Sequence, residues 1–371
     1  MVGAGALRTE LATELPAMLA EIERLAAIDS GSYDLAGVDA VADGFGELFA
    51  VRGFAVTRDG HALTARRELG PGRTLLLVGH ADTVWTEGWP VTRDGDWLRG
   101  PGVGDMKACV VMAAHALGVA LARRPAGLGA VEVLVVPDEE LGSPASRGWI
   151  EARAREADAC LGLEAGWPGG GVVVARGAVG AVYVTARGRT AHCAAHEDEG
   201  ASAVAALAPL VGALESCSRG SARVSVGVFR GGTARQVVPD EAELHVDLRA
   251  PDAAAADELL DRVRDAVVGV RAPGVSVELR GGWTRPPFEE DRSARLLALA
   301  AARAAELDIP LVAERSRGGS DASFAAALGV ETLDGLGPIC HDSCARDERI
   351  EISSLADRGA LLAALALDLF A

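Results

Sequence analysis

Three continuous, mainly apolar runs constrain the fold of this chain more than any other feature. They cover residues 74–78, 131–136 and 159–163, and each has the length of a strand. A strand that is apolar on both sides is typical of a sheet covered on both faces. Helical patterns such as residues 106–121 separate the runs, and an N-terminal helical pattern is expected to be kinked or restarted at Pro16. The sequence therefore predicts an α/β domain with a mostly parallel sheet.

A different pattern occupies the middle of the chain. Between about residues 178 and 281, elements are predicted in the order β-α-β-β-α-β, over residues 179–186, 201–214, 223–229, 242–248, 253–268 and 275–279. This order is typical of a ferredoxin-like α+β domain. Helical patterns resume after the Pro286-Pro287 pair. We therefore expect a domain over 178–285 that is inserted into a domain formed by residues 1–177 and 286–371.

Composition and charge restrict the partners of the chain. Of its 371 residues, 49% are hydrophobic and 24% are charged, as in packed globular proteins. Lys and Arg number 36 against 53 Asp and Glu, and the net charge of -17 disfavours nucleic acid and anionic membranes. No apolar run approaches the roughly 18 residues of a membrane span. The N-terminus is unlike a signal sequence and the six cysteines are scattered, so we expect a cytoplasmic protein.

Ionisable residues follow the ends of the three apolar runs. The first run leads to His80 and Asp82, the second to acids at 138–140, and the third to Glu164. A glycine-rich segment, GPGVGD, places Asp105 at a predicted helix start. Alone, each has an ordinary explanation, such as a capped turn, a helix N-cap or a solvated acidic loop. Because open α/β sheets bind ligands at the carboxyl ends of their strands, the four together indicate a site for a divalent metal such as zinc.

These segments carry a resemblance that extends over nearly the whole chain. The matching segments are HADTV, GPGVGDMKA, PDEELGS, LGLEAG, GRTAHCAAHEDEGASA, GGTARQVVPDEAELHVDLR, GGSDASF and DGLGP. The chain resembles the co-catalytic zinc peptidases and deacylases, which include glutamate carboxypeptidase, aminoacylase, acetylornithine deacetylase and succinyl-diaminopimelate desuccinylase. The resemblance implies a catalytic domain holding two zinc ions and an inserted lid domain through which two copies dimerise.

The resemblance also implies a role for each residue of the metal site. Asp105 would bridge two zinc ions, His80 and Glu164 would complete one site, and Glu140 would belong to the other. Asp82 would orient His80, and Glu139 would be the general base. His192, in the inserted domain, would steady the oxyanion, either in its own chain or across a dimer.

The last metal ligand departs from the pattern of the resembled family. Relatives have a histidine four residues before a glutamate, and counting back four residues from Glu348 leads to Cys344. A shifted loop would make His341 the ligand instead, and the gap-free reading favours Cys344. A thiolate lowers the Lewis acidity of a bound ion relative to imidazole. Cys340 and Cys344 could also be small buried residues with no chemical role.

Further candidate residues would border the substrate. Gln236 stands where relatives usually have asparagine, and Arg317 replaces the first glycine of a GGGSD-type loop that continues to Gly319. Arg249 would bind a substrate carboxylate, unless it pairs with an acid of its own domain. The remaining histidines have no comparable sequence context and are expected to be structural or exposed: His61, His115, His196 and His245.

The leading hypothesis is a dimeric zinc amidohydrolase of the carboxypeptidase or deacylase type. It would cleave an amide or peptide bond in a small N-acyl amino acid or dipeptide-like substrate. The altered last ligand motivates one alternative, a biosynthetic enzyme for an unusual acyl cleavage or transfer. A non-catalytic relative is another, and the presence of Glu139 argues against it.

Overall fold

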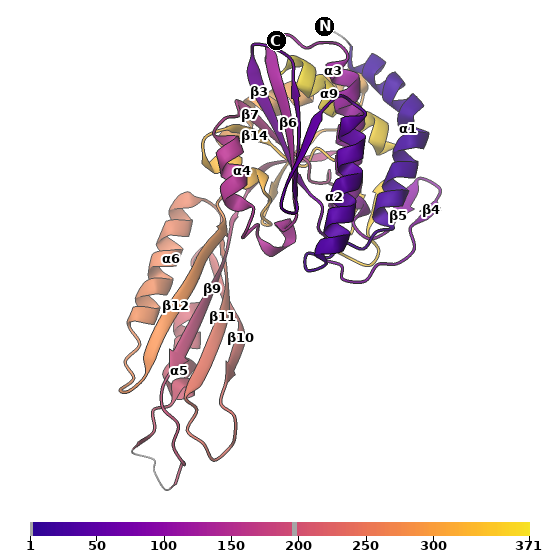
Figure 1. Cartoon of the computed structure of the whole chain (residues 1–371). Coiled ribbons are helices and arrows are strands. Elements are labelled where there is room, and N and C mark those ends of the chain that lie inside the picture. The colour runs from indigo at the N-terminus through magenta and orange to yellow at the C-terminus, as the bar shows by residue number, and fades with distance from the viewer. Residues whose placement is uncertain (1–2, 195–198) are drawn as a thin grey trace. The chain divides into compact units, whose positions relative to one another are not determined.

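The computed structural model describes residues 3–194 and 199–371, which form two compact units (Figure 1). The main unit comprises Met1–Ala175, Phe288–Ser316 and Ser320–Ala371, and the inserted unit comprises Arg176–Pro287 with Arg317–Gly319. The predicted insertion covered residues 178–285 and did not include Arg317–Gly319. These three residues come from a later part of the chain and pack with the inserted unit.

The main unit is built on a six-stranded sheet with the order β1-β2-β6-β3-β7-β14. Strands β6 (Leu128–Val136), β3 (Arg73–His80), β7 (Ala159–Gly162) and β14 (Glu331–Leu333) run parallel to one another. Strands β1 (Ala55–Asp59) and β2 (Ala62–Glu68) form an antiparallel hairpin at one edge. The prediction of an α/β fold with a mostly parallel sheet is confirmed.

Helices cover both faces of this sheet, which explains the continuous apolar runs. Leu75 and Leu77 of β3 join the large core formed with α1 (Ala4–Ala26), α2 (Leu35–Ala50), α3 (Ala108–Leu121), α7 (Ala294–Leu307) and α9 (Ser354–Asp368). Leu76 and Val78 point to the opposite face and pack near α4 (Arg147–Ala154) and α8 (Ala322–Ala327). Successive strand residues alternate between faces, so both sets of side chains must be apolar.

Two helices of the main unit bear on the sequence-based expectations. Helix α1 is continuous through Pro16, so the helix does not restart at that residue. Its residues Leu11, Met18 and Ile22 are fully buried, and this packing outweighs the lost backbone hydrogen bond. The stretch Val103–Leu121 is long and apolar enough to cross a membrane by length and composition alone. However, 89% of its residues, taken over an 18-residue window, are buried inside the protein.

A small antiparallel sheet holds the loop that carries Cys344. Its order is β15-β16-β5-β4, formed by Cys340–His341, Arg349–Glu351, Trp97–Arg99 and Thr92–Asp94. Residues 342–348 connect β15 to β16 and therefore start and end at neighbouring strands. A second small sheet pairs β13 (Val312–Ser316) with β8 (Gly171–Arg176).

The inserted unit has the predicted β-α-β-β-α-β order. Its elements are β9 (Ala178–Arg187), α5 (Ala203–Glu215), β10 (Arg223–Gly231), β11 (Glu241–Ala250), α6 (Ala253–Val268) and β12 (Ser276–Arg285). The sheet order is β10-β11-β9-β12, with antiparallel neighbours throughout. Ser202 and Asp252 cap the two helices by accepting backbone hydrogen bonds from Ala205 and Ala255. The unit has its own hydrophobic core, centred on residues such as Val182, Leu207 and Leu259.

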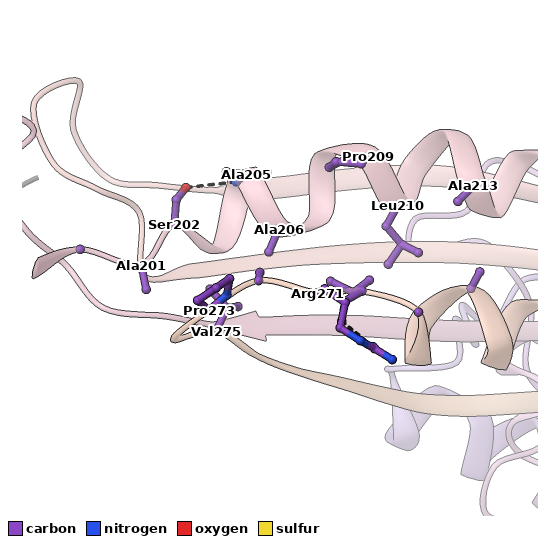
Figure 2. Close-up of a pocket in the computed structure, with 15 residues that line it drawn as sticks. Ala201, Ser202, Ala205, Ala206, Pro209, Leu210, Ala213, Arg271, Pro273 and Val275 are labelled. Carbon is purple, nitrogen blue, oxygen red and sulfur yellow. Dashed lines mark hydrogen bonds between the residues drawn. The ribbon is translucent and has the colours of Figure 1, made fainter. Parts of the chain in front are cut away.

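A cavity of about 490 Å³ lies in the inserted unit between α5 and the segment that follows α6 (Figure 2). Small and apolar residues such as Ala206, Leu210 and Ala213 line it, and Arg271 is the one ionisable residue among the described residues of its lining. The Arg271 guanidinium donates hydrogen bonds to the carbonyls of Val268 and Val270. The described part of this lining therefore offers none of the acids or general bases that a hydrolytic site needs.

Candidate metal centre

The ends of the parallel strands bring the predicted ligands of the main unit together. His80 is the last residue of β3 and pairs in register with Val136, the last residue of β6. Glu139 and Glu140 follow β6, and Glu164 follows β7. Asp105 lies in the tight turn Val103–Lys107 that leads into α3, and its peptide bond to Met106 is cis. Residues separated by up to 84 positions in the sequence thus meet at one edge of the sheet.

Two groups of metal-ligating side chains share Asp105. The donor atoms of His80, Asp105 and Glu164 all lie within 4.8 Å of one another, as do those of Asp105, Glu140 and Cys344. His80 Nε2 is 3.0 Å from Asp105 Oδ1, and Cys344 Sγ is 3.2 Å from Asp105 Oδ2. The two oxygens of one carboxylate therefore face two different donor groups.

Asp82 supports this arrangement from the side away from Asp105. His80 Nδ1 lies 2.8 Å from the Asp82 carbonyl oxygen and 3.4 Å from its carboxylate, which directs Nε2 towards Asp105. The Asp82 carboxylate also accepts hydrogen bonds from the backbone N–H groups of Glu139 and Glu140, at 3.1 and 3.2 Å. Asp82 is 0% exposed, so these bonds are shielded from water. One buried carboxylate thus contacts the histidine and holds the turn that carries both glutamates.

Ser32 belongs to the same network, and the sequence analysis did not identify it. Its hydroxyl donates a hydrogen bond of 2.7 Å to the Asp82 carboxylate, and its N–H donates to the Thr83 carbonyl. Ser32 lies in the loop between α1 and α2, fifty positions before Asp82. Nothing in the local sequence distinguishes it from an ordinary loop serine, so only the tertiary structure places it here.

Glu348 and the glycines shape the turn that carries Asp105. One Glu348 carboxylate oxygen accepts hydrogen bonds from the N–H groups of Gly104 and Asp105, at 2.8 and 3.1 Å. Gly102 has a φ of 68°, and a Cβ on Gly104 would lie only 2.1 Å from Cys340 Sγ. The glycine-rich sequence is therefore required by a left-handed residue and by close packing. The alternative explanation of Asp105 as a helix N-cap does not apply, because α3 begins at Ala108 and its N-cap residue is Lys107.

The acids of this site are packed too closely to ionise together without cations. Burial and the charge of Asp105 raise the pKa of Glu140 to about 9, and the same causes raise the pKa of Glu164 well above its ordinary value. Burial and the nearby charges of Asp105 and Glu140 also raise the pKa of the Cys344 thiol. Burial opposes protonation of His80, but Asp105 and Asp82 outweigh it and raise its pKa. Protons or metal cations must therefore balance the negative charge of the cluster.

The donor set fits divalent metal ions. It offers one imidazole nitrogen, three carboxylates and one thiol sulfur, which are the ligand types that bind zinc. Glu140 Oε1 is buried and has no hydrogen-bond partner among the described residues. A buried, unpartnered acid oxygen beside a second carboxylate is costly unless a cation faces it.

Cys344, and not His341, lies beside Asp105. His341 is held elsewhere, because its Nε2 lies 2.8 Å from a Glu351 carboxylate oxygen and its ring packs edge-to-face on Trp97. Cys340 is buried against Gly104, as expected of a small buried residue. Glu139, the predicted general base, lines one pocket with His80 and Glu164.

The predicted site residues of the inserted unit form two separate groups. His192 pairs with Val237, and the neighbouring Cys193 N–H donates to the Gln236 carbonyl, so His192 and Gln236 share one end of the sheet. Arg249 makes a bidentate ion pair with Asp247 and donates weakly to the Arg317 carbonyl. Gly319 lies in the same loop as Arg317 and packs against the side chain of Arg285, the last residue of β12.

These two groups lie at opposite ends of the inserted sheet. Glu241 pairs with Arg187 at one end and Arg249 with Val179 at the other, a separation of about 25 Å along β11. A small substrate therefore cannot touch both groups of one chain.

Three of the remaining histidines, His61, His115 and His245, lie outside the candidate metal site. His61 lies 3.0 Å from Asp39, and His115 is 2% exposed between Glu14 and Glu21. His245 packs on Tyr183 in the inserted unit. His196 lies outside the described residues.

Comparison with known proteins supports the same family. Residues 76–368 match the model of peptidase family M20/M25/M40. The chain is 27% identical to carboxypeptidase G2 of Pseudomonas sp. (strain RS-16), over 96% of this chain and 90% of that protein. It is 28% identical to succinyl-diaminopimelate desuccinylase of Marinobacter nauticus, over 76% of this chain and 81% of that protein.

A solved structure shows the same fold. A putative aminohydrolase from methicillin-resistant Staphylococcus aureus has a TM-score of 0.78 with this chain, at 16% identity over 98% of this chain and 99% of that one. Together with the matched family model, this confirms the resemblance that the sequence motifs indicated. The chain belongs to peptidase family M20/M25/M40 and is a hydrolase of that family.

Proposed function

We propose that this protein is a zinc-dependent amidohydrolase that cleaves the amide bond of a small N-acyl amino acid or dipeptide-like substrate. The observation that carries the proposal is the pair of donor groups that share Asp105. Two groups built on one carboxylate suit two neighbouring divalent ions. His80 and Glu164 would hold one ion, and Glu140 and Cys344 the other.

The chain's own residues supply the proton transfers. Bound zinc ions would polarise the scissile carbonyl and make water acidic enough to attack it near neutral pH. Glu139 would take the proton from the attacking water and deliver it to the amide nitrogen as the carbon–nitrogen bond breaks. Asp82 would hold the Glu139 backbone and the His80 ring in place, since it contacts both.

Substrate recognition is proposed for residues of the inserted unit. The names of carboxypeptidase G2 and the desuccinylase describe enzymes that release an amino acid or remove a succinyl group. Arg249 would release its ion-pair partner Asp247 and bind the substrate carboxylate in its place. The loop that contains Arg317 and Gly319 would border the same position, since Arg249 contacts the Arg317 carbonyl. Gln236 and His192 would contact the substrate from the other end of the sheet.

The separation of these groups supports a homodimer. Because His192 and Arg249 lie at opposite ends of a sheet that is about 25 Å long, one substrate could use both only if a second copy supplied one of them. We therefore propose that His192 reaches the site of the partner chain and donates to the oxyanion there.

The test combines metal analysis with a substrate panel. We expect about two zinc ions per chain, loss of activity on chelation, and its return with zinc. The panel should include N-acetyl, N-succinyl and aromatic N-acyl amino acids, and dipeptides. Glu139→Gln should lower kcat by about 10²–10⁴ and leave the zinc content unchanged, because Glu139 acts on the proton and does not hold the metal.

Glu140→Gln is the matched control, since it makes the same substitution at the adjacent residue, which is the proposed metal ligand. Unlike Glu139→Gln, it should lower the zinc content. The proposal fails if the purified protein binds no zinc and hydrolyses no member of the panel.

The thiol favours a second candidate function. Three carboxylates and a thiolate would cancel the charge of two zinc ions, whereas a histidine in place of Cys344 would leave a positive charge. The thiolate would therefore weaken activation of water. A slower attack by water would favour acyl transfer to an amine in a biosynthetic reaction. Adding amine acceptors to the reaction and identifying the acylated product by mass spectrometry distinguishes transfer from hydrolysis.

A further inference from the structure

The loop that carries Cys344 is fixed at its base by contacts beyond its own backbone. Arg349, the first residue of β16, forms an ion pair with Asp342, and its guanidinium lies 5.1 Å from the ring centroid of Trp97. His341, on the other side of the loop, packs on the same Trp97 ring. These contacts hold both ends of the loop. Within its tip, residues 343–347, Arg349 donates to the Asp347 carbonyl at 3.0 Å, and the Ser343 hydroxyl donates to the Asp105 carboxylate at 3.0 Å.

The backbone of this loop needs such support. Asp342 and Cys344 have φ values of 54° and 58°, in the left-handed region that residues other than glycine seldom adopt. A residue keeps this conformation when the surrounding structure holds it there. Moving the backbone of Cys344 out of this region would turn its Sγ away from Asp105.

Arg346 adds a contact from the tip to a different segment of the main unit. Its guanidinium carbon lies 5.0 Å from the ring centroid of Trp85 and 4.8 Å from that of Trp89. The two indoles pack edge-to-face with centroids 4.9 Å apart, so together they form a rigid aromatic corner. Trp85 and Trp89 follow directly after the segment that carries His80 and Asp82. Arg346 therefore joins the loop of one proposed ligand to the segment of another.

We propose that Arg346 is a positioning residue that keeps the Cys344 sulfur at the metal centre by docking between Trp85 and Trp89. The inference rests on the proposed function, because it assumes that Cys344 binds a metal ion. Arg346 contacts neither Asp105 nor Glu140 in the described structure, so it would act only through the loop. A competing role for an exposed arginine beside an active site is to bind a substrate carboxylate.

Cobalt binding tests the proposal without any substrate. A cysteine thiolate bound to Co²⁺ produces a sulfur-to-metal absorption band in the near ultraviolet, whereas carboxylates and imidazole do not. The metal-free full-length protein is titrated with Co²⁺, and the band reports only on Cys344. Cys344→Ser should abolish it.

Two variants of Arg346 separate the effect of its positive charge from that of its size, and a variant of Arg73 is the control. Arg346→Met keeps length and loses the charge, and we expect the affinity measured by the band to fall about tenfold, as two lost cation–π contacts predict. Arg346→Lys keeps a cation over the rings and should recover much of the affinity. Arg73→Met removes a similar pair, Arg73 over Phe370, at the opposite end of β3 and should leave the band unchanged.

The outcomes distinguish this inference from the proposed function. If the natural protein binds Co²⁺ and Arg346→Met matches it in band and affinity, the inference is wrong and the hydrolase proposal stands. A raised KM with an unchanged band would assign Arg346 to substrate binding and also overturn the inference. Retention of the band in Cys344→Ser overturns it as well. If the natural protein binds no metal at all, the proposed function fails first.

Discussion

Single side chains decide how the acidic strand ends of this protein are held together. Asp82 is fully buried and receives hydrogen bonds from the backbone of Glu139 and Glu140 and from the Ser32 hydroxyl, besides its contact with His80. Each bond fixes the direction of one carboxylate oxygen. Groups that hold metal ligands in this way commonly affect metal affinity as strongly as some ligands do.

Ser32→Ala should therefore weaken zinc binding by about 10–100-fold, because Asp82 loses one of its hydrogen bonds and becomes less well oriented. Competition with a chromophoric chelator measures the affinity. Ser30→Ala is the matched control, since the Ser30 hydroxyl is buried two residues away and has no hydrogen-bond partner in the described part of the chain. Equal affinities of the two variants would show that Ser32 does not position Asp82.

The turn before α3 shows how an element depends on two glycines. Residues 100–107 must bring Asp105 to the sheet edge, start α3 and pass beside Cys340. Gly102 supplies the left-handed backbone, and Gly104 leaves room for the Cys340 sulfur. The segment thus resembles a ligand-binding glycine loop in sequence, although packing against the protein itself accounts for its glycines.

Gly104→Ala should destabilise the protein by about 1–3 kcal/mol, because the new Cβ overlaps the Cys340 sulfur. Urea unfolding measures the change in the free energy of unfolding. The Cys340→Ala background should recover part of the loss, since it removes the overlapping sulfur. Gly148→Ala, on the exposed side of α4 with open space around it, should instead stabilise slightly. Equal effects of the two substitutions would contradict the packing argument.

The elements differ in how far the sequence predicts them. Strands β3, β6 and β7 are predictable because each is buried on both faces. The β1–β2 hairpin is not, because residues 62–68 end in two arginines and a glutamate that suggest an exposed segment. In the structure Arg66 lies opposite Glu132 of β6, with 2.5 Å between their side-chain atoms. Glu132 is 2% exposed, so its charge is tolerated only because Arg66 and Arg153 pair with it.

At the scale of the whole molecule, the proposed dimer makes a specific prediction about mixed subunits. Glu139→Gln and His192→Ala should each inactivate the homodimer. Co-expressed, they should form heterodimers in which one of two sites has Glu139 from one chain and His192 from the other. Random pairing then restores about a quarter of the natural activity.

Sedimentation should show that both single variants remain dimeric, which makes the loss of activity a site effect. If His192 acts within its own chain, mixing restores nothing, because every site then lacks one of the two groups. A monomeric natural protein would also contradict the proposal.

The type of sheet, the element order of the inserted unit and the donor types at the strand ends can all be predicted from the amino-acid sequence. They depend on periodicity and on the rule that parallel strands end at one edge, both of which are local or nearly local properties. The folded chain was needed to show that Cys344 lies at Asp105 while His341 pairs with Glu351, and that Ser32 reaches Asp82. These contacts join residues far apart in the chain through loops whose paths depend on packing, and no pattern of neighbouring residues records that packing.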